Sequence, residues 1–303
     1  MKIVITGANS AVGQAILRCR SSQAVPYALV ATVRSERAAA EIRPLLGQGT
    51  SLTQISYGDP GSLDAAFGGA SAIIHLAGIL FERPDSSYAQ ANVESAGAVV
   101  DAAKRCGVEK LVLISATGAD ETSLNGYYRT KGQAEALVRA SGLRYTILRA
   151  PLLLGPETEG GAALARNASG RKAKLIGGGR HFQQPLYVDD LARAALAATQ
   201  PAVADNRTLE LVGPVSLPER ELVERAARVL DRSVQIGSIP KRLLRWGLTL
   251  RGRVTGPGFS VAVLEVITAD TRLDPQAAAS ELGIRLTGID EMIQNSLGQE
   301  RKK

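Results

Sequence analysis

The chain has 303 residues, of which 45% are hydrophobic and 21% charged, a composition typical of a soluble globular protein with a packed core. The 36 basic and 29 acidic residues give a net charge of +7, which favours phosphorylated ligands but is too diffuse to indicate a nucleic-acid-binding protein. Two cysteines are too few for a disulfide framework or a zinc site. The sequence shows no signal peptide and no long apolar run, so we expect the protein in the cytoplasm.

The first expected strand, residues 3–5, runs into a glycine-containing turn and then a helix. The turn reads Thr-Gly-Ala-Asn-Ser-Ala-Val-Gly from Thr6 to Gly13. A glycine at 7 permits a tight turn, a small Ser10 lets a phosphate approach the backbone, and Gly13 lets the helix pack closely on the strand. Free N–H groups at the start of a helix favour an anion. The alternative is an ordinary strand-to-helix turn, but we favour a pyrophosphate site formed by Gly7, Asn9, Ser10, Ala11, Val12 and Gly13.

A second strand is expected at 27–33, and basic residues follow it directly. In a dinucleotide-binding fold the adenosine ribose lies here, and an acidic residue would bind the 2′-hydroxyl of NAD. Arg34, Ser35 and Arg37 instead offer cationic and hydroxyl donors that suit a 2′-phosphate. NADP(H) is therefore preferred and NAD(H) is possible, while Glu36 keeps open the alternative of a solvated helix start.

Strands and helices continue to alternate through the middle of the chain. The pattern predicts strands at 54–57, 72–78, 110–115 and 145–149, and helices at 62–67 and 88–105. His75 lies within an almost wholly apolar strand, so we interpret it as a core histidine. Ser115 and Thr117 stand at the carboxyl end of the strand at 110–115, where side chains face the crevice in which open α/β sheets bind ligands.

Tyr127 and Lys131 lie four residues apart, so on a helix they share one face. A phenol with its ordinary pKa of ~10 is a poor acid–base catalyst at neutral pH, but a neighbouring ammonium favours the phenolate and lowers that pKa. A hydroxyl from Thr117 or Ser115 would hold a substrate carbonyl while Tyr127 exchanges its proton. The alternative is an exposed turn of helix without a catalytic role.

Together these motifs resemble the short-chain dehydrogenase/reductase superfamily, specifically its extended and atypical branches. Within the superfamily the chain looks like the group that contains the accessory dinucleotide-binding subunit of respiratory complex I and the NmrA-like proteins. The motifs that carry the resemblance are Thr6–Gly13, Gly58-Asp59, His75–Gly78, Asn92, Ser115–Asp120, Tyr127-x-x-x-Lys131, Leu148–Pro151 with Gly155-Pro156, and Pro185–Leu191.

The resemblance implies a Rossmann fold, an α/β architecture with a doubly wound parallel sheet, and a smaller C-terminal substrate lobe. It implies that Asp59 lies near the adenine and that Lys131 also bonds the nicotinamide ribose. The other cofactor contacts that it implies are Ala77, Gly78, Asn92, Ala150, Pro151 and Leu152. We expect residues 1–155 to form the dinucleotide-binding domain, with 183–200 returning to it, and 156–303 to form mainly the substrate lobe.

The last third of the chain carries fewer motifs. Asp189 would cap a helix at 189–199, and a clear amphipathic helix is expected at 217–229. The basic, amphipathic stretch 239–253 fits a helix of the substrate lobe with a charged outer face, and Trp246 is expected to pack rather than to bind a ligand. Binding of a phosphorylated substrate, an acidic partner or a membrane surface by this stretch is the alternative.

The leading functional hypothesis is an NAD(P)-dependent oxidoreductase that reduces a carbonyl or enone of a small metabolite. Tyr127 would be the acid, Lys131 would tune it, and Thr117 with Ser115 would polarise the oxygen. One alternative is a catalytically silent NADP(H)-binding regulatory or assembly protein. Another is a nucleotide-sugar epimerase or dehydratase, which Arg34 and the short segment before Tyr127 disfavour. No metal and no nucleic acid are expected, and a membrane or protein partner is not indicated.

Overall fold

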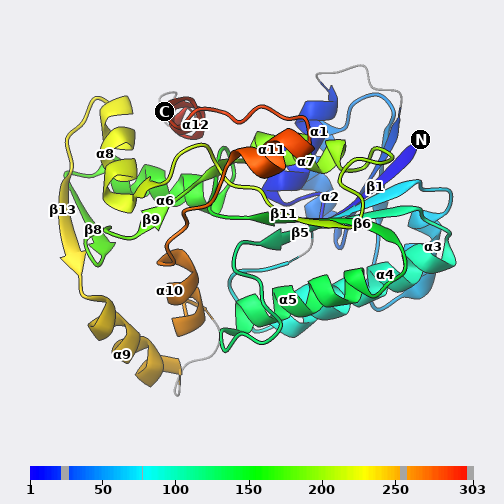
Figure 1. Ribbon diagram of the computed structural model, residues 1–303, viewed down its shortest axis with the longest axis horizontal. Coiled ribbons are helices and arrows are strands. Elements are labelled where there is room, and N and C mark those ends of the chain that lie inside the picture. Colours follow the sequence, from blue (N-terminus) through cyan, green and yellow to red (C-terminus); the bar gives the residue numbers. More distant parts are fainter. Residues whose placement is uncertain (22–26, 77, 253–257, 299–303) are drawn as a thin grey trace.

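The computed structural model describes residues 1–21, 27–76, 78–252 and 258–298. Its centre is a seven-stranded sheet in which every neighbouring pair of strands is parallel, in the order β11-β6-β5-β4-β1-β2-β3 (Figure 1). The strands are β1 Lys2–Thr6, β2 Ala28–Val33, β3 Thr50–Gln54, β4 Ala72–His75, β5 Lys110–Ala116, β6 Arg144–Ala150 and β11 Arg207–Glu210. The order reverses between β1 and β4, so the ligand crevice of such a sheet lies there. The predicted doubly wound Rossmann sheet is confirmed.

Helices cover both faces of this sheet and bury two separate apolar cores (Figure 1). One face carries α1 Ala11–Ser21, α2 Glu36–Ile42 with the 3₁₀ turn Arg43–Leu45, and α7 Val188–Ala197. The other carries α3 Pro60–Phe67, α4 Ser95–Arg105 and α5 Gly126–Arg139. The inner strands have apolar residues on both faces, which explains why their sequences read as continuous hydrophobic runs.

Three predictions about single elements differ from the structure: one strand boundary, the geometry of one helix start and one helix cap. The third strand, expected at 54–57, ends at Gln54, because β3 is a polar edge strand whose register follows β2. The helix expected over 88–105 begins with a π-helical turn, Ala89–Glu94, before α4. Asp189 does not cap α7, which begins at Val188 without a side-chain cap and so includes Asp189 in its first turn.

A C-terminal lobe packs beside the carboxyl ends of the strands, and its three central helices contact one another. They are α6 Glu159–Ser169, α8 Glu219–Val229 and α12 Ile289–Leu297. Short two-stranded ladders join the segments between them: β7 Leu153–Leu154 with β10 Leu186–Tyr187, β8 Lys172–Ile176 with β13 Gln235–Ile239, and β9 Phe182–Gln183 with β12 Leu217–Pro218. The remaining helices are α9 Lys241–Gly252, α10 Val261–Ile267 and α11 Gln276–Glu281.

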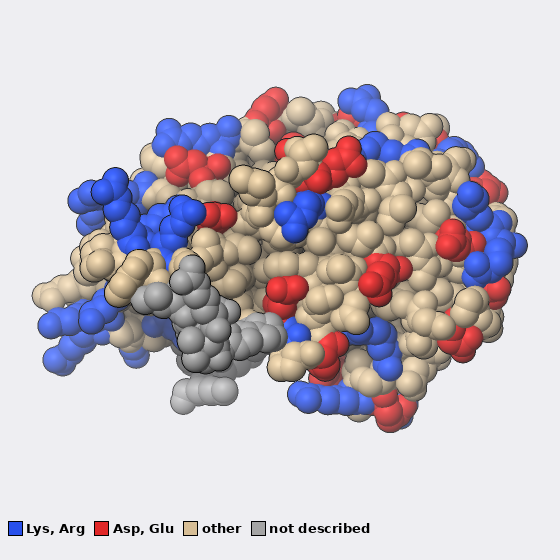
Figure 2. Space-filling model, turned by 90° about the horizontal axis from the view of Figure 1, so that it is seen from below, with Lys and Arg blue, Asp and Glu red and all other residues tan. Residues whose placement is uncertain are grey.

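The outer part of the lobe is basic. Figure 2 shows Lys and Arg side chains gathered at the end of the molecule that carries the lobe, and Lys241, Arg242 and Arg245 of α9 are all exposed. Trp246, expected to pack, is 67% exposed on the same helix, so that expectation is wrong. Within the described ranges, none of the helices is both long and apolar enough to cross a lipid bilayer.

Candidate functional site

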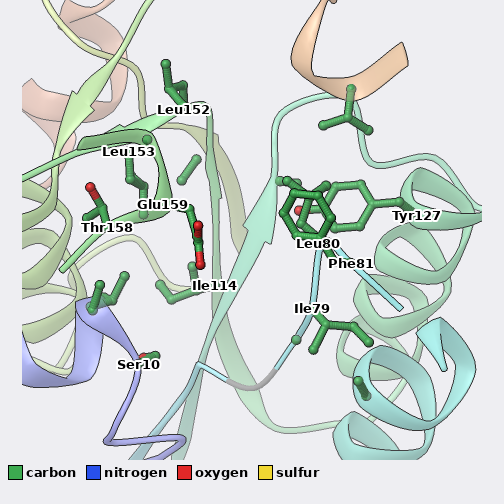
Figure 3. A pocket seen from close by; sticks show the side chains of 18 of the residues that line it. Ser10, Ile79, Leu80, Phe81, Ile114, Tyr127, Leu152, Leu153, Thr158 and Glu159 are labelled. Atoms are coloured by element: carbon green, nitrogen blue, oxygen red, sulfur yellow. The ribbon is translucent and has the colours of Figure 1, made fainter. Parts of the chain in front are cut away.

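A cleft of about 1540 Å³ opens where the sheet meets the C-terminal lobe. The loop after β1, the segments after β4 and β5, helix α5 and the lobe all contribute to its walls. In Figure 3, Ser10 of the first loop, Tyr127 of α5 and Glu159 of α6 lie around one cavity. The cleft therefore collects residues from Gly7 to Thr271, over most of the length of the chain, at the edge where the topology predicts a ligand.

The first glycine loop forms the floor of the cleft beneath α1. Gly7 has a left-handed φ of 76°, and a Cβ on Gly13 would lie 2.4 Å from the carbonyl oxygen of Ala8, so both positions require glycine. The hydroxyl of Ser10 accepts a hydrogen bond from the amide of Gly13 at 3.2 Å. The side chain of Ser10 thus satisfies the amide of Gly13, which is then not free for a ligand. The other predicted residues of the loop line the cleft: Gly7, Asn9, Ser10, Ala11 and Val12. The amides of the first helical turn have no acceptor within the helix, which fits a pyrophosphate.

Of the basic residues predicted to bind the 2′-phosphate, Arg34 alone is among the described residues that line the cleft. Ser35 caps α2 and accepts a hydrogen bond from the amide of Ala38 at 3.3 Å. The side chain of Arg37 is 91% exposed and pairs with Glu41 at 3.6 Å. Short polar residues before a helix satisfy its free amides, so the expectation of cofactor donors at Ser35 and Arg37 is not matched by their contacts.

The segment after β3 bounds the part of the cleft where the resemblance leads us to expect the adenine. Tyr57 and Gly58 line it, whereas Asp59 caps α3 by accepting a hydrogen bond from the amide of Gly61 at 3.0 Å. The resemblance placed Asp59 itself near the adenine. In this structure the carboxylate of Asp59 caps α3 instead. Asp59 follows the lining residues Tyr57 and Gly58 in the chain but does not itself line the cleft.

Gly78 brings the end of β4 close to α5. A Cβ at this position would lie 2.6 Å from Nζ of Lys131 and 2.9 Å from Oδ1 of Asn92, so the missing side chain leaves room for both. The amide nitrogen of Asn92 donates to the hydroxyl of Thr130 at 3.0 Å, and its oxygen accepts from the amide of Ile79 at 3.3 Å. Buried Asn92 therefore fixes the loop after β4 against α5. Ala77, which was also expected to contact the cofactor, lies outside the described residues.

Tyr127 and Lys131 both line the cleft from one face of α5, as their spacing predicts. Asn125 caps the helix and accepts a hydrogen bond from the amide of Tyr127 at 3.1 Å. Lys131 donates through Nζ to the carbonyl oxygen of Ile114 at 3.2 Å. This contact ties the helix to β5 and keeps the ammonium group beside Gly78, just after β4.

Burial controls the ionisation of both residues. It raises the pKa of Tyr127 well above its ordinary value, with a smaller contribution from neighbouring Tyr128 and Tyr88. It lowers the pKa of Lys131 to about 8, although Glu135 opposes the shift. The expectation that Lys131 lowers the pKa of Tyr127 is therefore wrong, because desolvation of the phenol dominates the shift.

Thr117 and Ser115 differ in what their hydroxyls contact. Ser115 is buried and donates to Oε1 of Glu135 at 2.6 Å, so its proton is already engaged away from a substrate. The hydroxyl oxygen of Thr117 is buried and has no partner within the described structure. Both residues line the cleft. An unpartnered hydroxyl beside a cavity fits a group that awaits a ligand oxygen, and this applies to Thr117.

The remaining walls are largely apolar and were only partly predicted. Ala150, Pro151 and Leu152 line the cleft as expected. The sequence reasoning missed other lining residues because no motif marks them: Ile79, Leu80 and Phe81 after β4, Glu159 on α6, Glu219, Leu222 and Val223 on α8, and Phe259 and Ile267 around α10. His75, by contrast, is fully buried with Nδ1 2.6 Å from the hydroxyl of Thr6, and burial lowers its pKa to about 3.

Similarity to known proteins agrees with this geometry. A family model described as NAD(P)H-binding matches residues 7–177. The uncharacterised sugar epimerase YhfK of Bacillus subtilis is 26% identical over 70% of this chain and 94% of its own. The 40 kDa subunit of the NADH-ubiquinone oxidoreductase of Neurospora crassa is 23% identical over 75% of this chain but only 60% of its own length.

Solved structures show the same fold. The UDP-glucuronic acid 4-epimerase of Bacillus cereus, in complex with UDP-glucuronic acid and NAD, superposes with a TM-score of 0.78 at 17% identity, covering 100% of this chain and 99% of that one. At such identity the likeness concerns the fold. The glycine loop, the sheet order and the match over more than half of the residues together show that the chain belongs to the NAD(P)H-binding family and fits the extended and atypical branch of the short-chain dehydrogenase/reductases.

Proposed function

We propose that the protein is an NADP(H)-dependent reductase that transfers a hydride to a carbonyl or enone of a small metabolite. One observation carries the proposal: Tyr127, Lys131 and the unpartnered hydroxyl of Thr117 line the same cleft as the glycine loop. The cleft thus combines an anion-binding helix start with a proton donor and a hydrogen-bond donor for an oxygen. We take the partner to be a small molecule and the location to be the cytoplasm.

In this proposal each side chain has a distinct role. Thr117 donates a hydrogen bond to the substrate oxygen, and Tyr127 gives up its phenolic proton to that oxygen. A raised pKa keeps the phenol protonated at neutral pH, which is the form needed for reduction. Lys131 holds the ribose next to the nicotinamide and supplies positive charge beside the phenol. When bound, the reduced nicotinamide supplies the hydride, which no side chain of the chain can provide.

The preference for NADP(H) rests on Arg34. Arg34 lines the cleft together with Tyr57 and Gly58, at the end where the adenosine of a dinucleotide lies in this fold. A guanidinium binds a phosphate with two parallel hydrogen bonds, and a ribose hydroxyl cannot form this bidentate contact. The other two predicted donors make helix-capping and surface contacts, so we assign the discrimination between the two dinucleotides to Arg34 alone.

The test compares NADPH oxidation by the parent with that of Tyr127→Phe over a panel of ketones, aldehydes and enones. Loss of the phenolic proton is expected to lower kcat by about 10²-fold or more while NADPH still binds. Tyr145→Phe is the matched control, because Tyr145 lies at the start of β6, away from the residues that line the cleft, and should leave kcat unchanged. Equal rates for the parent and Tyr127→Phe would exclude Tyr127 as the acid.

Two alternatives have specific support. A cofactor-binding protein without turnover agrees with the desolvated phenol and with the likeness to a respiratory complex subunit. It predicts NADPH binding without turnover of any compound in the panel. An epimerase agrees with YhfK and the superposed structure. It predicts tightly retained NAD(H) and binding of a UDP-sugar, so identification of the nucleotide that copurifies with the chain separates it from the reductase.

A further inference from the structure

The wall of the cleft opposite α5 carries a carboxylate that no role described above uses. Glu219, the first residue of α8, lines the cleft together with Leu222 and Val223 of the same helix, and its side chain is 26% exposed. Its Oε2 is buried and has no hydrogen-bond partner in the described structure. A buried carboxylate oxygen without a partner is costly in free energy, so its position beside a cavity calls for a ligand.

The fold also holds a histidine against this carboxylate. The ladder of β9 and β12 ends with a hydrogen bond from the amide of Glu219 to the carbonyl oxygen of His181 at 3.0 Å, which places the two side chains next to each other. Nε2 of His181 lies 3.6 Å from Oε2 of Glu219 and is likewise buried without a hydrogen-bond partner among the described residues. Thus two polar atoms from residues 38 positions apart in the chain approach each other behind the cleft wall, and neither has a hydrogen-bond partner among the described residues.

The charges around the pair define what it can accept. From the C-terminal lobe and the segment leading into it, the described residues that line the cleft include the carboxylates Glu157, Glu159, Glu219 and Asp270 but only one guanidinium, Arg166. Glu157 is paired with Arg18 at 3.1 Å. The exposed basic residues of the lobe, such as those of α9, lie on its outer surface. The few charged groups on this largely apolar inner wall are therefore mainly acidic, although the chain as a whole carries a net charge of +7.

We propose that Glu219, backed by His181, receives the hydrogen-bond-donating head group of an amphiphilic substrate, a hydroxyl or primary amine, and that the wall rejects phosphorylated compounds. The apolar body of that substrate lies along Leu222, Val223 and Phe259, which share the cleft with Glu219. The assignment of this ligand as a substrate rests on the proposed reductase function. The recognition itself depends only on the lobe.

The ionisation of the pair agrees with such a head group. Burial raises the pKa of Glu219 to about 7, so the carboxylate gains its charge between pH 6 and pH 8. Burial and Lys241 lower the pKa of His181 while Asp270 opposes them, so the imidazole is neutral over the same range. Amine binding should therefore strengthen as the pH rises from 6 to 8, because the carboxylate becomes charged while the ammonium keeps its proton.

The experiment titrates the full chain with n-octylamine, 1-octanol and n-octyl phosphate by calorimetry, with and without saturating NADP⁺. At pH 8 we expect n-octylamine to bind at least about tenfold more tightly than n-octyl phosphate, with 1-octanol between them. Glu219→Gln should weaken n-octylamine about tenfold. Glu224→Gln is the matched control, since that exposed residue of α8 pairs with Arg220 and should leave binding unchanged.

Three results would overturn the proposal: n-octyl phosphate binds as tightly as the amine, Glu219→Gln leaves amine affinity unchanged, or none of the three compounds binds. Amine affinity of the parent that is equal at pH 6 and pH 8 would also count against Glu219, and this comparison needs no variant. NADPH binding and ketone reduction are measured on the same samples. If the chain binds n-octylamine as expected but does not bind NADPH or reduce ketones, the proposed reductase function is wrong and the proposed recognition site is still supported.

Discussion

At the residue scale, burial acts in opposite directions on the two side chains that the proposed chemistry needs. It keeps the phenol of Tyr127 protonated and makes the ammonium of Lys131 easier to deprotonate. Lys131 is 8% exposed and has one described hydrogen bond, to the carbonyl of Ile114. Its charge is therefore held in place at a cost in stability, as is common for groups kept for binding rather than for folding.

Replacing Lys131 by methionine should make the protein more stable and less able to bind cofactor. The pKa falls from 10.5 in the reference state to about 8 in the folded protein, so below pH 8 the folded chain carries an unfavourable buried charge. We expect Lys131→Met to raise the free energy of unfolding by about 1–2 kcal/mol at pH 7. That gain should shrink as the pH rises from 8 towards 10.5. Thermal unfolding at pH 7 and 9.5, with NADPH titrations alongside, measures both effects; a destabilised variant with unchanged affinity would contradict the assignment.

Arg34 and Arg37 provide a matched pair for the cofactor preference. Arg34→Ala should weaken NADPH binding about tenfold or more and leave NADH binding nearly unchanged, because only the 2′-phosphate loses a partner. Arg37→Ala should change neither, since that side chain faces solvent and pairs with Glu41. Fluorescence titration of both dinucleotides against both variants gives the comparison. A larger effect from Arg37 would show that the adenosine end lies elsewhere.

Sequence motifs located the polar residues of the site better than they assigned their contacts. Tyr127, Lys131 and Thr117 line the cleft, as predicted from their positions after β5 and on one helix face. Ser35 and Asp59 have types and positions that suit a ligand, but the same features suit a helix cap, and capping is the contact observed. Desolvation of the phenol depends on neighbours brought in by folding, so spacing alone gave the wrong direction for its pKa.

At the element scale, a buried ion pair sets the position of α5. Glu135 has no exposed surface and accepts hydrogen bonds from Arg149 at 2.7 and 2.8 Å and from Ser115 at 2.6 Å. Arg149 in turn pairs with Glu210 at 3.1 Å. The network ties α5 to β5, β6 and β11, so it holds the helix that carries Tyr127 and Lys131 against three strands.

Glu135→Gln should lower the free energy of unfolding by about 2 kcal/mol at pH 7, because partly buried Arg149 would keep Glu210 but lose its fully buried carboxylate partner. Burial opposes ionisation of Glu135, but hydrogen bonds from Arg149 and Ser115 prevail and hold its pKa below 4.5. The stabilisation is thus complete above that value and is lost as the pH falls through the folded pKa. Urea unfolding at pH 7 and at pH 4 measures it. The exposed Glu109→Gln should cost less than about 0.5 kcal/mol, and an equal loss in both variants would refute the role of the network.

The elements that the sequence predicted well are those buried on both faces. β1, β4 and β5 are buried along nearly their whole length, and their positions were predicted to within a few residues. β3 was displaced because an edge strand with polar residues lacks that signal. The exposure of Trp246 was missed because an amphipathic pattern predicts which side chains share a helix face, but it does not say what covers that face.

At the scale of the whole molecule, the fold followed from the order of motifs, whereas the substrate side did not. The glycine loop, the strand ends and the Tyr-x-x-x-Lys pair recur at spacings that define the sheet and its crevice. The lobe contributes single residues from distant segments, such as Glu159, Glu219 and Phe259, that share no spacing rule. Only the packing of α6, α8 and α10 beside the sheet brings them to one cleft, so their part in recognition depends on the three-dimensional arrangement.

The most direct test of a dinucleotide site at the glycine loop is calorimetric titration of NADPH into the parent and into Ala11→Glu. A carboxylate in the first turn of α1 is favourable for the helix dipole but would repel a pyrophosphate at the loop that lines the cleft. We predict binding by the parent, at least about 100-fold weaker binding by the variant, and no loss of thermal stability. No detectable affinity in the parent, or equal affinity in both proteins, would contradict a dinucleotide site at this loop.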